Sequence, residues 1–192
     1  MKTNKHVIWD FVSKNQKRFQ ELADKVWSTP ETCYSEQNSM SAHVDELIYH
    51  GFSVTKGIAN IPTAVVGEYG TDGPIIAFLG EYDALAGLSQ KADVFHQDPV
   101  KKGANGHGCG HNLLGSASMQ AAVALRDWLK ESNLPGVVRY YGCPAEEGGA
   151  AKTFMVRDKI FKDVDAAITW HPGCLPGIVK GSSLANCRVD FT

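Results

Sequence analysis

The strongest chemical signal in the sequence is the run Asn105-Gly106-His107-Gly108-Cys109-Gly110-His111-Asn112. Thiolate and imidazole are preferred ligands of zinc and similar metals. Because Cys109 and His111 are two residues apart, they cannot share one face of a helix, but a tightly turned loop can bring both to one ion. The glycines allow such a backbone, and the dipole of a helix expected over 113–131 favours a thiolate at its start. The run therefore predicts a metal-binding loop.

Other interpretations of this run remain open. It can be a flexible glycine-rich loop whose cysteine and histidine are incidental, or a structural zinc site. It can also provide Cys109 as a nucleophile with His111 as its base, although catalytic cysteine–histidine pairs usually come from distant segments. The nucleophile interpretation leaves the carboxylates described next without a role, and structural zinc sites rarely use adjacent acids.

A pair of adjacent acids, Glu146 and Glu147, follows a predicted strand over 137–141 and precedes two glycines. Neighbouring residues of a turn can point in different directions, so one carboxylate can bind a metal while the other holds the attacking water. An acidic, solvated turn would give the same pattern. The pair is therefore a candidate for metal binding and general base catalysis, in the same site as Cys109 and His111.

Two more strands are expected to end at groups of the same kind. His171 follows an apolar segment over 166–170, and Asp83 follows an apolar segment over 75–79. A carboxylate often supports a ligand histidine by accepting its second N–H, which is a possible role for Asp83. Taken alone, His171 can be a structural histidine and Asp83 a turn residue. The case for a metal site rests on the convergence of all these groups.

The elements that must position these residues alternate between helices and strands, as in an α/β layered fold. Helices are expected over 5–28, 39–50 and 113–131 and near 150–160, and strands over 52–56, 63–69, 74–79, 137–141 and 166–170. The uninterrupted apolar run at 75–79 predicts a strand covered on both faces, and 166–170 predicts a buried strand. In such folds functional groups gather at the ends of strands.

Length and composition agree with one soluble domain. The chain has 192 residues, 43% of them hydrophobic and 21% charged, and a net charge of -2. This balance gives no reason to expect nucleic acid as a partner, and no apolar run reaches the roughly 20 residues that span a membrane. Without a secretory signal, we expect a cytoplasmic protein. The five widely spaced cysteines do not indicate a disulfide framework.

Three short runs together resemble the aminoacylase/carboxypeptidase-type metallopeptidase family, in the amidohydrolase branch that includes auxin-conjugate hydrolases. They are Gly-His-Gly-Cys-Gly-His at 106–111, Pro-Ala-Glu-Glu-Gly-Gly at 144–149 and Trp-His-Pro at 170–172, and the segments 80–89 and 152–157 extend the similarity. The resemblance implies a layered zinc-peptidase-like catalytic domain with a central mixed sheet between helices. It covers nearly all of the chain.

The resemblance also assigns roles residue by residue. It implies two divalent ions, zinc or manganese, with the ligands Cys109, His111, Glu147 and His171. Glu146 would be the general base on a metal-bridging water, and Asp83 would support the metal centre from outside it. His107 receives no role. The implied reaction is hydrolysis of the amide bond of N-acyl or N-aroyl amino acids, with p-aminobenzoyl-glutamate as the type of substrate.

Two departures from the family qualify this expectation. Auxin-conjugate hydrolases commonly have aspartate where this chain has Asn112. Family members are also longer, with a lid and dimerisation domain inserted after the strand that His171 follows. We therefore expect residues 1–181 to be the N-terminal part of the catalytic domain and 182–192 to begin the lid. The full-length form would be a homodimer or a hetero-oligomer with a related subunit, and the truncated chain could instead be a non-catalytic metal-binding remnant or a partner-dependent subunit.

Overall fold

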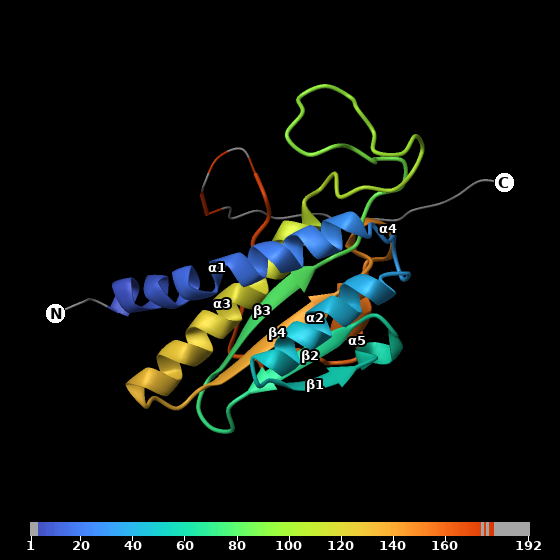
Figure 1. Ribbon diagram of the computed structural model, residues 1–192. Helices are drawn as coiled ribbons and strands as arrows, with labels where there is room; N and C mark the ends of the chain where they lie inside the picture. The colour runs from blue at the N-terminus through green and yellow to red at the C-terminus, as the bar shows by residue number, and fades with distance from the viewer. Residues whose placement is uncertain (1–3, 174, 176, 179–192) are drawn as a thin grey trace.

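The computed structural model describes residues 4–173, 175, 177 and 178 (Figure 1). The helices are α1 (Asn4–Ser28), α2 (Gln37–Tyr49), α3 (His111–Ser132), α4 (Glu146–Gly149) and α5 (Ala151–Arg157), with a short 3-10 helix η1 (Ile58–Asn60). The strands are β1 (Ser53–Lys56), β2 (Val65–Tyr69), β3 (Ile75–Glu81), β4 (Val137–Cys143) and β5 (Ala166–Ile168). Each helix and strand expected from the sequence is present, with shifted ends.

The strands form one mixed sheet in the order β1-β2-β4-β3-β5. β3 runs parallel to both β4 and β5, whereas β2 is antiparallel to β1 and β4. Because β3, β4 and β5 are parallel, the segments that leave their carboxyl ends emerge at the same edge of the sheet. The predicted fold class, an α/β layered domain with a central mixed sheet between helices, is confirmed.

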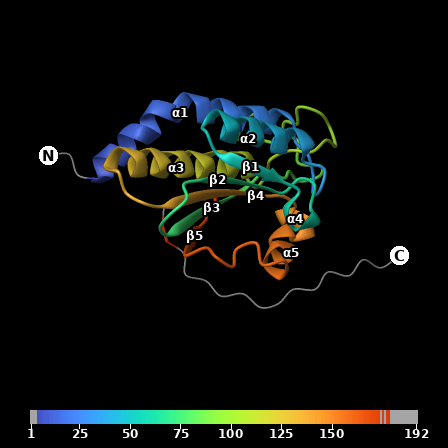
Figure 2. The same ribbon diagram turned by 90° about the horizontal axis from the view of Figure 1, so that it is seen from below.

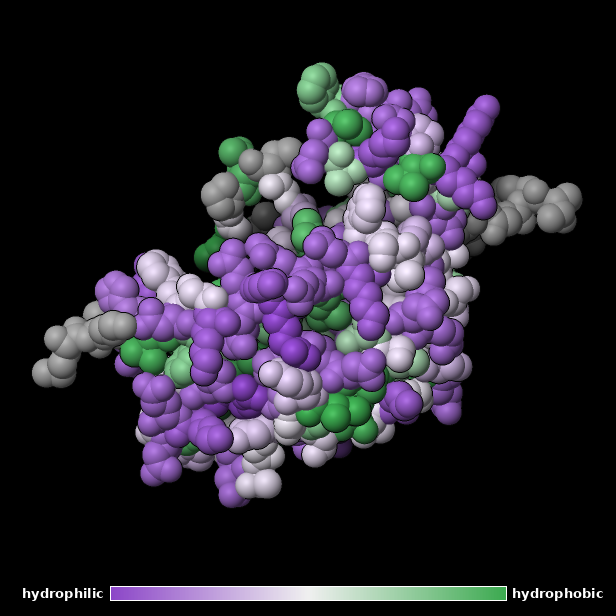
Figure 3. Space-filling model, in the orientation of Figure 1, coloured by the Kyte–Doolittle hydropathy of each residue, from purple (hydrophilic) through white to green (hydrophobic). Residues whose placement is uncertain are grey.

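Helices cover the sheet unequally. Figure 2 shows α1, α2 and α3 together on one face and α4 and α5 on the other. The larger apolar core lies under the first three helices and contains Leu47, Met119 and Val138, while a smaller core around Tyr141 and Met155 lies under α5. On the face seen in Figure 3, hydrophobic residues form small separate patches among hydrophilic ones. No helix in the described part of the chain is long and apolar enough to cross a membrane.

The strand predicted over 166–170 is shorter and less buried than expected. β5 contains only Ala166–Ile168, and all three residues are exposed. Cover on both faces of β3 is also incomplete, since Ile75, Ile76 and Leu79 are only half-buried. An apolar segment indicates a strand, but it does not reveal which neighbours pack on it, and β5 lies at the edge of the sheet. The predicted boundary between residues 181 and 182 lies outside the described residues.

Candidate metal centre

The carboxyl ends of β3, β4 and β5 bring residues distant in sequence to one place. Glu81 is the last residue of β3, the Glu146–Glu147 pair opens α4 just after β4, and His171 follows β5. The first residue of α3, His111, lies among them. α3 can approach β3 closely because Gly115 has no side chain: a Cβ there would lie 2.4 Å from the carbonyl oxygen of Glu81.

Asp83 fixes the orientation of His111. The imidazole is completely buried, and its Nδ1 lies 2.8 Å from Asp83 Oδ1 and 3.1 Å from the Asp83 carbonyl oxygen. Since both partners can only accept, Nδ1 must carry the proton and donate it. Nε2 is therefore the nitrogen left to bind a metal, which is the arrangement that a supporting carboxylate usually imposes on a ligand histidine.

The second oxygen of Asp83 positions the acidic pair. Asp83 Oδ2 accepts the backbone N–H of Glu147 at 2.9 Å, and the Cys33 thiol lies 3.7 Å from the same oxygen. One carboxylate thus connects the histidine at the start of α3 to Glu147, the second residue of α4. The structure brings Asp83, His111 and Glu147 together as the sequence predicts.

Three buried atoms converge without a well-formed hydrogen bond to any described residue: Glu81 Oε2, His111 Nε2 and Glu147 Oε1. His111 Nε2 is 2.9 Å from Glu81 Oε2 and 3.8 Å from Glu147 Oε1. Buried polar atoms are rarely left unpartnered, because each one costs the free energy of its lost hydration. A nitrogen and carboxylate oxygens that face one another in this way are a donor set suited to a divalent cation, so the residues fit the metal that the sequence predicts.

Cys109 and His171 complete the ligand cluster on its exposed side. Their Sγ and Nε2 atoms are 3.1 Å apart, and the rings of His111 and His171 are nearly perpendicular with centroids 5.9 Å apart. Ligand atoms of Cys109, His111 and His171 lie within 4.8 Å of one another, as do those of Glu81, His111 and Glu146. His171 itself is exposed. Three of the four predicted ligands, Cys109, His111 and His171, therefore form one group, and Glu81 and Glu146 form a second group around the same histidine.

The charges at this site favour bound cations. Burial lowers the pKa of His111, but the hydrogen bond to Asp83 and the negative charges of Asp83 and Glu81 outweigh it and raise the pKa to about 10. Burial, together with Glu147, raises the pKa of the Cys109 thiol to about 12. A nucleophilic cysteine needs a lowered pKa, so this environment does not support Cys109 as a nucleophile. The imidazole 3.1 Å from its sulfur is that of His171.

Glu146 has the surroundings of a general base. Its Oε2 lies 3.8 Å from His111 Nε2, and its side chain is 44% exposed. Burial and the negative charge of Glu81 raise the pKa of Glu146 above its ordinary value. A raised pKa places the titration of the carboxyl closer to pH 7. A general base transfers protons most effectively when its pKa is near the working pH.

Sequence reasoning missed Glu81 and its partner Lys152. Lys152 of α5 forms an ion pair with Glu81 Oε1, which leaves Oε2 facing His111. Burial raises the pKa of Glu81, but its charged contacts with His111 and Lys152 lower it further than burial raises it. The spacing of Glu81 and Asp83 contained a signal, because residues two apart in an extended segment point to the same side.

A third missed residue, Glu36, holds the turn before the acidic pair. Its Oε1 accepts the backbone N–H groups of Ala145 and Tyr34, each at 2.9 Å. Ala145 has a φ of 53°, in the left-handed region that residues other than glycine seldom adopt. Glu36 is completely buried and therefore stabilises this backbone from inside the protein. No pattern in the sequence connected Glu36 to the site.

Comparison with known proteins agrees with this fold. No family model matches the chain. The chain is 47% identical over 184 residues to one subunit of the p-aminobenzoyl-glutamate hydrolase of Escherichia coli (strain K12), covering 96% of this chain and 38% of that protein. It is 34% identical over 112 residues to a second subunit of the same hydrolase, covering 55% of this chain and 25% of that protein. A solved dinuclear metal-binding peptidase of the M20 family from Bacillus subtilis has a TM-score of 0.62 and 23% identity, over 80% of this chain and 42% of that one.

The sheet order and its helical cover are those of a metallopeptidase catalytic domain. The chain is similar over nearly its whole length to part of one subunit of the E. coli hydrolase, and it shares its fold with part of an M20-family peptidase. It spans 38% of the length of the hydrolase subunit to which it is 47% identical.

Proposed function

We propose that this chain carries the greater part of a two-metal site that hydrolyses the amide bond of N-acyl or N-aroyl amino acids. Zinc or manganese would be held by Cys109, His111, Glu147 and His171. The main support is the convergence of His111 Nε2, Glu81 Oε2 and Glu147 Oε1, buried atoms with no well-formed hydrogen bond to a described residue. The identity to the p-aminobenzoyl-glutamate hydrolase of E. coli supports p-aminobenzoyl-glutamate as the type of substrate.

Each side chain has a separate task in this proposal. Bound metal ions polarise the scissile carbonyl and lower the pKa of water, which is the chemistry that the protein groups cannot supply alone. Asp83 holds His111 in the tautomer with a free Nε2 and fixes the backbone of Glu147. Glu146 takes the proton of the attacking water and passes it to the leaving amine, a step worth about 10²–10⁴-fold in rate.

A second candidate is a metal-binding chain that needs a partner for turnover. The exposure of His171 and of the Glu146 side chain favours it, because an effective hydrolase site excludes bulk water from the reacting groups. The similarity to two different subunits of one hydrolase also supports a partner of the same family.

The deciding experiment measures metal content and hydrolysis of p-aminobenzoyl-glutamate for the chain and for single glutamine substitutions. We expect Glu146→Gln to keep its metal and lose turnover by about 10²–10⁴-fold, because it removes only the proton acceptor. Glu147→Gln should lose metal as well. Glu131→Gln, at an exposed position near the end of α3, is the matched control and should change neither.

Each outcome separates the two candidates. Bound metal without turnover by the unmodified chain would favour the partner-dependent candidate, and adding a homologue of the second hydrolase subunit should then restore hydrolysis. Full activity of Glu146→Gln would remove the general base assignment.

A further inference from the structure

The loop that carries the metal ligands is attached to α1 by three side chains that have no part in the proposed chemistry. Asn105 donates its amide N–H to the carbonyl oxygen of Pro30 at 3.2 Å, just past the end of α1. His107 Nε2 lies 3.1 Å from the carbonyl oxygen of Val26, and Asn112 donates to that of Ala23 at 3.3 Å. These donors come from both sides of Cys109 and His111.

The acceptors suit these donors. Val26 lies in the last turn of α1, where its carbonyl oxygen accepts the backbone N–H of Thr29 at 3.1 Å and has a second lone pair available for His107. A carbonyl oxygen can only accept, so His107 Nε2 carries the proton in this contact. This contact gives a structural role to His107, a residue with no place among the ligands.

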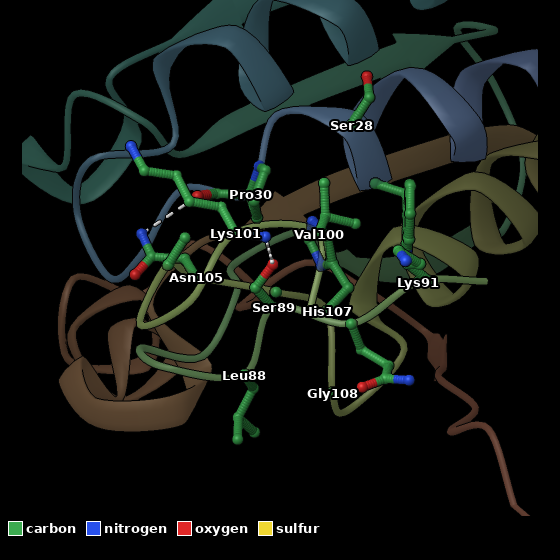
Figure 4. A pocket seen from close by; sticks show the side chains of 14 residues that line it. Ser28, Pro30, Leu88, Ser89, Lys91, Val100, Lys101, Asn105, His107 and Gly108 are labelled. Atoms are coloured by element: carbon green, nitrogen blue, oxygen red, sulfur yellow. Dashed lines mark hydrogen bonds between the residues drawn. The ribbon is translucent and has the colours of Figure 1, made fainter. Parts of the chain in front are cut away.

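Packing alone does not hold this loop against the helix. A cavity of about 410 Å³ lies between the end of α1 and the 86–108 segment, and Figure 4 shows Pro30, Asn105 and His107 on its walls with a dashed line from Asn105 to Pro30. A second cavity of about 660 Å³ shares Trp27, Ser28 and His107 with the first. Because open space borders His107 in both, the hydrogen bonds carry much of the attachment.

We propose that Asn105, His107 and Asn112 are positioning residues that fasten the ligand-bearing loop to the C-terminal end of α1, and so set where the Cys109 thiolate and the His111 imidazole lie. This inference rests on the proposed metal centre for its purpose. It also accounts for the amide at position 112. An aspartate there would place a carboxylate oxygen against the carbonyl oxygen of Ala23, with no hydrogen to share.

The chain offers a closely matched control. Gln120, on the same helix as Asn112, donates its amide to the carbonyl oxygen of Val12 in α1 at 2.9 Å. Both bonds therefore join α3 to α1 through the same chemistry, but only Asn112 is next to the loop. Asn112→Asp and Gln120→Glu make the same chemical change at the two places. A general loosening of α1 from α3 affects both variants, and loss of loop position affects only the first.

Two measurements on the 192-residue chain test the inference. In the metal-free chain, Asn112→Asp should speed hydrogen exchange of the backbone amides over 105–112, and Gln120→Glu should not. In a cobalt(II) titration followed through the thiolate-to-cobalt absorption, Asn112→Asp should weaken affinity by about 10–100-fold, the usual effect of losing a group that orients a ligand. Gln120→Glu should bind cobalt like the unmodified chain, even where its stability to urea falls equally.

The outcomes distinguish failure of the attachment from failure of the metal centre. Unchanged exchange over 105–112 in Asn112→Asp, or an equal change in both variants, would overturn the attachment. An unmodified chain that binds no cobalt would overturn the metal centre and leave the attachment to be judged on exchange. If Asn112→Asp does not fold, His107→Phe and His107→Gln decide: glutamine, which keeps an N–H donor, should restore the protection that phenylalanine loses.

Discussion

Two histidines of this protein, His43 and His111, are completely buried, and they differ mainly in the charge of the groups around them. His43 of α2 and His111 of α3 each place Nδ1 against an oxygen acceptor, and in each the buried Nε2 has no well-formed hydrogen bond to a described residue. His43 faces the carbonyl oxygen of Ser39 at 2.9 Å, whereas His111 faces the carboxylate of Asp83 at 2.8 Å. Burial lowers the pKa of His43 to about 4, and the carboxylates raise that of His111 to about 10.

The difference separates a structural histidine from a functional one. Burial alone keeps an imidazole neutral, because the charged form loses its hydration. The rings of Tyr82 and Tyr140 pack around His43 with centroids 5.0 and 5.9 Å away and give it no countercharge. The two surroundings adjoin at Gly115, four residues after His111, where a Cβ would lie 2.8 Å from His43 Nε2 and 2.4 Å from the Glu81 carbonyl oxygen. The acidic groups, and not the depth of burial, make this site attract a cation.

The largest contrast should be in metal affinity. We expect His111→Gln to weaken zinc binding by more than the roughly 10–100-fold that follows loss of a supporting group, because it removes a ligand. His43→Gln should leave the affinity of the folded chain unchanged. Competition with a chelating dye measures both. Similar losses in the two variants would mean that His111 contributes through the fold and not as a ligand.

Asp83→Asn should make His111 more like His43. The asparagine oxygen can still accept from Nδ1, but the negative charge is gone. In the metal-free chain we expect the pKa of His111, followed by NMR, to fall from about 10. Stability should fall by about 3–5 kcal/mol, the usual cost of removing one member of a buried ion pair.

The direction with pH follows from the raised pKa. The contribution of charged His111 is complete near its ordinary pKa of about 6.5 and disappears as the pH rises through about 10, so the loss in Asp83→Asn should be larger near pH 6 than near pH 10. A His111 pKa that does not change in Asp83→Asn would contradict the assignment of Asp83 as its main partner.

His43 should control part of the acid sensitivity of the chain. Unfolded His43 binds a proton below its ordinary pKa of about 6.5, whereas folded His43 binds one only below about 4. Between these values the unfolded state holds the extra proton, so stability falls as the pH decreases, by up to about 1.4 kcal/mol per pH unit. Urea unfolding over this range should show a smaller slope for His43→Gln. Equal slopes would show that other groups dominate.

Sequence patterns predicted much of this arrangement for identifiable reasons. The helical spacing of apolar residues indicated α1 and α3. Short apolar runs bounded by glycine and proline indicated the strands. Asp83 and His171 were recognisable because each follows a predicted strand, where functional groups gather. Cys109 was recognisable because it lies just before a predicted helix. The geometry that joins them depends on β3 lying between β4 and β5, which a single sequence does not specify.

The residues that escaped prediction act through contacts between distant segments. Glu36 and Ala145 are 109 residues apart in sequence, and Glu81 and Lys152 are 71 apart. Each is an ordinary charged or small residue in its own segment. The predicted burial of β5 was wrong for a related reason, because exposure depends on which elements pack against a strand and not on the apolar character of the strand.

The parallel arrangement of β4, β3 and β5 has a consequence for the time course of folding. The contacts that assemble the site join residues 28, 62 and 64 positions apart, so three long chain loops must close first. Closing such loops costs chain entropy before the contacts of the site are made, so we expect these contacts to form after the transition state. A bound metal should therefore slow unfolding far more than it speeds folding, as stopped-flow chevrons recorded with and without zinc can show. The metal would therefore stabilise the native state against unfolding and would contribute little to the transition state for folding.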